Sequence, residues 1–196
     1  MLPDRCQIAL KEWAVTVHSL AQGQQILLLR KGGIHEEGKD FRVIHSEFLL
    51  YPTYEHQRED LLKPEHQSTL SQLLSELPRS ETITFTHWAK AEEIIEVSDQ
   101  EKVDELSPHH IWADEYAQSR LHWKPMLSLS IMLLRVYKIE QPVTVPFIPE
   151  YGGCTSWVEG IPTINLGNMK PVLADQEFQR QVDEIKGSLG LTVAAG

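Results

Sequence analysis

A chain of 196 residues, of which 41% are hydrophobic and 23% are charged, is long enough to bury a core and has the composition of a globular protein. Its formal net charge of −10 argues against a surface that binds nucleic acid on every side. No apolar run approaches the roughly 20 residues of a membrane span, and the two cysteines have no metal-binding spacing. The sequence therefore predicts a reduced, cytoplasmic protein without a membrane segment, a metal or a cofactor.

The first third of the chain predicts one helix and two strands. Apolar residues recur at helical spacing over residues 8–22, and Gly23 follows where a C-terminal cap belongs. Residues 24–30 then form a strand that is too apolar on both faces to be an exposed edge. A second strand covers residues 41–51, and Pro52 ends it.

The middle of the chain predicts a helix, a long strand and a short acidic helix. Four leucines of residues 66–77 lie on one helical stripe. Alternating residues over 82–97 indicate a long strand that bends near Ala89. Ser98 and Glu101 form a capping-box pair that opens the acidic helix.

The last part of the chain predicts a strand over residues 126–139 and a helix from Asp175 to Gly187. Between them, regular structure is interrupted by Pro142, Pro146, Pro149 and Pro162. Strands that cluster, rather than strictly alternate with helices, indicate an α+β fold with a mixed or antiparallel curled sheet and flanking helices. We expect residues 1–196 to form a single domain, with a proline-rich C-terminal extension and closing helix from about residue 142.

In the stretch LLLRKGGIHE, residues 27–36, two cations and two glycines follow the end of an apolar strand. Gly32, after Arg30 and Lys31, frees the backbone to turn and expose N–H groups, a geometry that suits phosphate or carboxylate. Arg42 adds a further cation, so one interpretation is a local basic patch on an acidic body. The other is an ordinary turn flanked by solubilising cations, since the spacing of a P-loop is absent.

Aromatic residues beside histidines are candidates for stacking a base. Trp88 follows His87, and Trp123 follows His122. Such a ring can stack a base while a nearby cation neutralises its phosphate, although large aromatic residues also form cores. The nine histidines show neither HExxH nor paired Cys/His spacing, so no metal site is predicted.

The segment YGGCTSWVEG, residues 151–160, places two glycines before Cys154. Bare backbone N–H groups can form an oxyanion pocket, and a histidine partner can activate the thiol. Cys154 is therefore the candidate nucleophile of a small amide or ester hydrolase. The alternative is a tight loop in which Cys154 is a small buried residue, and whether the protein is an enzyme stays open.

Polar side chains and turn-forming residues meet at strand ends in three segments: residues 30–33, 52–57 and 151–157. Strand ends hold functional groups on a rigid frame, while loops supply variable chemistry. We expect the three segments to lie on one rim around a single cleft, which Arg30, His56 and Tyr151 line.

The chain resembles the bacterial domain-of-unknown-function family numbered 1802 in four stretches that occur in this order: LKEWAVTVHSLAQGQQILLLRKGGI, EFLLYPTYEHQ, LRVYKIEQPV and YGGCTSWVE. The family has no established activity, and some members are associated with an Mrr-type restriction endonuclease domain. The resemblance therefore implies a link to restriction–modification, in a chain that carries only the uncharacterised part.

A second resemblance concerns the fold. The helix ended by glycine and the strand ending in arginine resemble the opening of ASCH and PUA-like barrels, and LLRVYKIEQPVTVP resembles a late strand of the EVE branch. Those barrels bind RNA or modified bases in a cleft between helix and sheet. The resemblance implies a PUA-like module of host defence or RNA metabolism that binds single-stranded or modified nucleic acid. In such a module Arg30, Lys31 and Arg42 would meet phosphate. Trp88 or Trp123 would stack a base.

Overall fold

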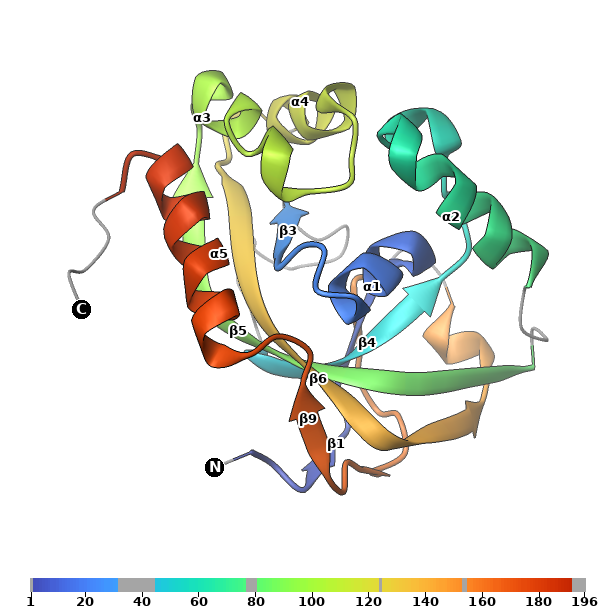
Figure 1. The fold of residues 1–196 in the computed structure, drawn as a ribbon. Helices are drawn as coiled ribbons and strands as arrows, with labels where there is room; N and C mark the ends of the chain where they lie inside the picture. Colours follow the sequence, from blue (N-terminus) through green and yellow to red (C-terminus); the bar gives the residue numbers. More distant parts are fainter. Residues whose placement is uncertain (1, 32–44, 77–80, 124, 153–154, 192–196) are drawn as a thin grey trace.

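The structure is a computed structural model, and it describes residues 2–31, 45–76, 81–123, 125–152 and 155–191 (Figure 1). Its helices and strands are, in chain order, β1 (Arg5–Cys6), β2 (Ala9–Trp13), α1 (Ala14–Ala21), β3 (Leu27–Arg30), β4 (Glu47–Thr53), α2 (Pro64–Ser75), β5 (Thr82–Val97), α3 (Gln100–Asp104), α4 (Asp114–His122), β6 (Leu129–Pro146), β7 (Trp157–Val158), β8 (Ile164–Asn165), β9 (Met169–Pro171) and α5 (Asp175–Ser188). Single 3-10 turns cover Glu59–Leu61, Ser107–His109 and Pro149–Tyr151.

One mixed sheet organises the protein, with strand order β3-β6-β5-β4-β2-β7 and with β9 paired to β6. β2 and β4 run parallel, and the other pairs of this sheet are antiparallel. β5 and β6 pair along nearly their whole length, with two register shifts that interrupt the ladder. Figure 1 shows both strands curving through the molecule. The predicted α+β fold with a mixed, curled sheet and flanking helices is therefore confirmed.

Buried apolar side chains lie in two clusters. The larger cluster joins helices to the sheet and includes Leu20 of α1 and Ile185 of α5, each 1% exposed. The smaller cluster packs Phe85 of β5 against residues of the C-terminal strands, such as Ile164. Figure 1 shows α5 beside β5 and β6, and α3 and α4 at one end of these strands. Within the described part of the chain, no helix is both long and apolar enough to cross a membrane.

The predicted helix over residues 8–22 is wrong in its first half, because residues 9–13 form β2. This segment pairs with β4 on one side and β7 on the other, so it buries Ala9 and Leu10 completely. Pairing on both sides outweighs a helical spacing of apolar residues, since such spacing is a local signal. The helix α1 begins only at Ala14, and Gly23 ends it with φ at 69°, as predicted for a C-terminal cap.

Two of the predicted proline breaks are also wrong. Pro52 lies inside β4, opposite Glu12 of β2, where the strand has lost its pairing to β5. Pro142 lies inside β6, in the bulge between Lys138 and Val143, and β6 continues through the predicted start of the C-terminal extension. Proline lacks a backbone N–H and is tolerated where a ladder bond is missing, which both positions provide.

Other boundaries agree more closely with the sequence. β5 has the predicted bounds, and α5 begins at Asp175 and ends one residue after Gly187. The acidic helix exists, but Asp99 rather than Ser98 caps it by accepting the Glu101 N–H. α4 was not predicted, because its exposed polar residues give it little helical periodicity.

Candidate functional site

Arg30 lies at the end of β3 and reaches across to the junction of β2 and α1. Its Nη2 donates to the Lys11 carbonyl at 2.6 Å and contacts Glu12 Oε2 at 2.8 Å. Its Nη1 donates to Ser156 Oγ at 3.3 Å, while the buried Nε has no partner in the described structure. The Nη1 nitrogen carries two N–H groups and uses one, so it keeps a donor that a ligand can satisfy.

Two further cations, Lys31 and Arg120, are found near Arg30 among the described residues. Lys31 is buried and donates from Nζ to the Leu121 carbonyl, and burial lowers its pKa. Arg120, one residue earlier on α4, lies 4.9 Å from the centre of the Tyr116 ring. Burial raises the pKa of Tyr116, and the Arg120 charge partly opposes this shift. Arg30, Arg120 and the Glu12 carboxylate all lie close enough to Tyr116 to affect its pKa, so among the described residues two cations share one carboxylate there.

Aromatic rings border the same junction. Trp13 packs on Tyr116 with ring centres 5.4 Å apart. On the other side, the half-buried Trp157 lies opposite Leu10 in the β2–β7 ladder, and His45 meets its ring edge-on at 5.3 Å. Trp157 Nε1 has no partner in the described structure. We call Glu12, Arg30, Ser156 and Trp157 the Arg30 cluster.

The three segments expected on one rim lie close together around β2 and α1. The contact between Arg30 and Ser156 joins the first segment to the third. Lys11 Nζ donates to the Gly152 carbonyl at 3.1 Å, and Gln57 Oε1 accepts the Val15 N–H at 3.2 Å. That these segments line one cleft stays a prediction. Two of the proposed lining residues differ in exposure. His56 is exposed, with φ at 58°, whereas Tyr151 is only 4% exposed.

The two predicted stacking residues, Trp88 and Trp123, differ in exposure. Trp88 is completely buried and packs on Tyr137 with ring centres 5.4 Å apart, so a base cannot reach it. The long strand carries Trp88 into the core because a register shift follows Phe85 and changes the alternation of buried residues. Trp123 follows the end of α4 and is 39% exposed.

Three of the predicted residues lie outside the described residues: Gly32, Arg42 and Cys154. The anion-binding turn after Lys31 and the cysteine hydrolase therefore stay predictions. Among the described residues, no group of three or more histidine, cysteine and acidic side chains is placed to hold a metal ion.

Sequence reasoning missed Glu12, Tyr116 and Arg120. Glu12 was missed because residues 8–22 were predicted to form a helix. A side chain on that helix would not be expected to pair with a residue at the end of β3. Tyr116 and Arg120 belong to α4, which was not predicted. The local sequence LKEW carries one usable signal, the two charged residues Lys11 and Glu12 between leucine and tryptophan in a strongly apolar segment.

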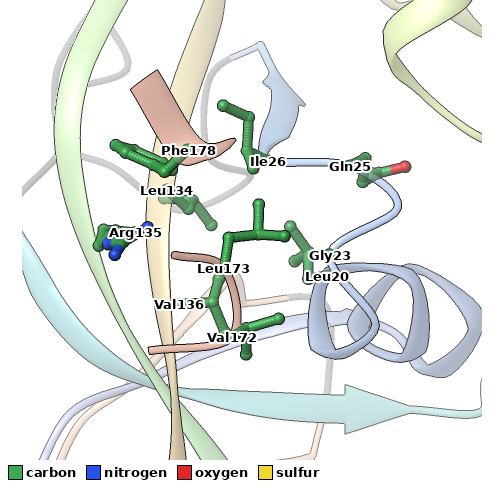
Figure 2. A pocket seen from close by; sticks show the side chains of 10 residues that line it. All are labelled: Leu20, Gly23, Gln25, Ile26, Leu134, Arg135, Val136, Val172, Leu173 and Phe178. Carbon is green, nitrogen blue, oxygen red and sulfur yellow. The ribbon is translucent and has the colours of Figure 1, made fainter. Parts of the chain in front are cut away.

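A hollow between α1, β6 and α5 is too small to bind a small-molecule ligand (Figure 2). Its walls are mostly apolar, and Leu173 and Phe178 point into it beside Arg135. Its cavity volume is about 10 Å³, far below the roughly 300 Å³ at which small-molecule pockets begin. Arg135 is already bound to Asp175 at 2.5 Å and lies 4.7 Å from the centre of the Phe178 ring. The hollow is therefore a packing gap.

The fold and the Arg30 cluster define an α+β protein with a partly exposed cation–aromatic site. The chain matches the family model described as "Domain of unknown function (DUF1802)" over residues 9–184, and it belongs to that family. A comparison with curated proteins found no match.

Two solved structures from Zymomonas mobilis are similar to the chain. One is the crystal structure of ASCH, with a TM-score of 0.43 and 11% identity, covering 90% of this chain and 93% of that chain. The other is the crystal structure of a ZmASCH serine-to-alanine mutant, with a TM-score of 0.44 and 12% identity, covering 93% of this chain and 98% of that chain.

Proposed function

We propose that this protein binds single-stranded or modified nucleic acid at the Arg30 cluster, in a role linked to restriction–modification or RNA metabolism. The observation that supports the proposal is that Arg30, which shares the Glu12 carboxylate with Arg120, contacts Ser156 next to the half-buried Trp157. Cations attract the phosphates of a strand, and an aromatic face stacks an unpaired base. Trp157 takes the stacking role that the sequence predicted for Trp88 or Trp123.

The acidic surface narrows the kind of binding that is expected. A net charge of −10 repels a long duplex, so the strand must enter locally at the Arg30 cluster. Binding should be weak, should favour short single strands, and should fall with added salt because phosphate contacts release counterions.

A fluorescence anisotropy titration with labelled single-stranded 8-mers at low salt tests the proposal. The variant Arg30→Gln removes the central cation, and we expect binding to weaken about 10- to 100-fold, the effect of losing a charged hydrogen bond. Arg30→Lys keeps the charge without the fork and should fall between the two. The matched control is Lys170→Gln, which removes the same charge from an exposed side chain on β9.

Thermal unfolding of each variant separates a lost contact from a lost fold, since Arg30→Gln leaves the Glu12 carboxylate without its partner. No binding by the wild-type protein would refute the proposal. Binding that both Arg30 variants leave unchanged would refute the assignment of the site.

A further inference from the structure

We infer that the Arg30–Glu12 pair recognises the hydrogen-bonding edge of a neutral nucleobase, not a phosphate. The negative charge of Glu12 determines this specificity. The inference rests on the proposed function, which it deepens by assigning what the centre of the site binds. It differs from the sequence-based expectation that Arg30 meets phosphate.

The donors of Arg30 are largely used inside the protein. A guanidinium carries five N–H donors. One from Nη2 serves the Lys11 carbonyl and one from Nη1 serves Ser156, while Glu12 Oε2 lies 2.8 Å from Nη2 as an ion pair. Of the other three donors, the one on Nε is buried and the second one on Nη2 is next to Glu12, which leaves the second Nη1 donor for a ligand. Bidentate phosphate binding needs a free fork, and Glu12 already occupies part of it.

The Glu12 carboxylate stands where an incoming anion would bind. Its side chain is 9% exposed, its Oε1 accepts the Trp13 N–H at 3.1 Å, and its Oε2 forms an ion pair with Arg30 Nη2 at 2.8 Å. A carboxylate has about four acceptor positions, so acceptor capacity remains beside the unused Arg30 donor. A phosphate offers acceptors only, and its negative charge would meet that of Glu12 in a half-buried place where repulsion is strong.

A nucleobase fits this combination of groups. Its Watson–Crick edge places an N–H donor beside a carbonyl or ring-nitrogen acceptor, and proteins read unpaired bases on this edge while an aromatic side chain stacks the ring. Glu12 would accept the N–H, Arg30 would donate to the acceptor, and Trp157 would supply the stacking face from the neighbouring strand. Phosphates of the strand would lie outside the pair, in the field of Arg120.

An abasic strand tests the inference without any substitution. Anisotropy is measured with labelled 8-mers of equal phosphate number, one carrying bases and one abasic at every position. We expect the wild-type protein to bind the strand with bases at least 10-fold more tightly, the ratio that one charged hydrogen bond supplies. Glu12→Gln should weaken binding of the strand with bases and strengthen binding of the abasic strand, because it removes the repulsion.

The two proposals fail in different ways. Equal binding of both strands by the wild-type protein, with loss in Arg30→Gln, would overturn base recognition and leave nucleic-acid binding in place. Tighter binding of the strand with bases by a folded Glu12→Gln variant would overturn the role of Glu12. No binding of either strand would overturn both proposals. If Glu12→Gln does not fold, as its thermal unfolding would reveal, the two wild-type titrations still decide.

Discussion

Acid should destabilise this protein through a histidine far from the Arg30 cluster. His110 is 4% exposed, and neither of its ring nitrogens has a partner in the described structure. Its ring lies 5.4 Å from that of Trp112. Burial lowers the pKa of His110 to about 4, helped by the charge of Lys63 and partly opposed by Asp114. The folded protein therefore resists a proton that the unfolded chain accepts.

The sign and size of the effect follow from this difference in pKa. Between pH 6.5 and pH 4 the unfolded state binds more protons at His110, so stability falls as the pH is lowered through this window and does not change further below it. With a pKa of about 4 against 6.5, the free energy of unfolding drops by about 2 kcal/mol at pH 5 and about 3 kcal/mol at the end of the window.

Urea unfolding at pH 7 and pH 5 measures the drop, and His110→Phe isolates it, because phenylalanine keeps a ring against Trp112 and cannot titrate. We expect the variant to lose about 2 kcal/mol less than the wild-type protein between the two pH values. His87 also has a pKa lowered to about 4, mainly by burial, so His87→Phe should give a second, similar reduction.

The control for general destabilisation is Val103→Ala, which opens a gap in the core and should lower stability equally at both pH values. An equal acid loss in His110→Phe and in the wild-type protein would refute the reasoning, because the proton would then bind elsewhere.

Three further substitutions test the fold. Gly23→Ala should cost about 2 kcal/mol in urea unfolding, because φ is 69° and the new Cβ would lie 2.5 Å from Leu173 Cδ2; no loss would mean that the helix end readily rearranges. Trp88→Ala should cost about 3 to 5 kcal/mol, since the ring is fully buried, and a loss below about 1 kcal/mol would contradict its place in the core. Asp99→Ala should cost about 1 kcal/mol by leaving the Glu101 N–H without its cap, and Asp99→Asn, which keeps an acceptor, should cost less.

Local patterns in the sequence were sufficient for elements whose stability comes from their own side chains. The alternation over residues 82–97 identified β5, and the apolar stripe after Asp175 identified α5. Gly23 marked the end of α1 because few residues other than glycine adopt a positive φ at low cost. Each of these signals is contained within a few residues, so it can be recognised without knowledge of the rest of the chain.

Tertiary structure decided the remainder through contacts between distant residues. Residues 9–13 became a strand because β4 and β7, far away in sequence, pair with both of its edges. Pro142 could lie within β6 because the register shift against β5 supplied a bulge. The pairing of Arg30 with Glu12 depends on bringing the ends of two non-adjacent strands of the sheet together. No periodicity encodes such a contact, because it arises only when the strands take their places in the sheet.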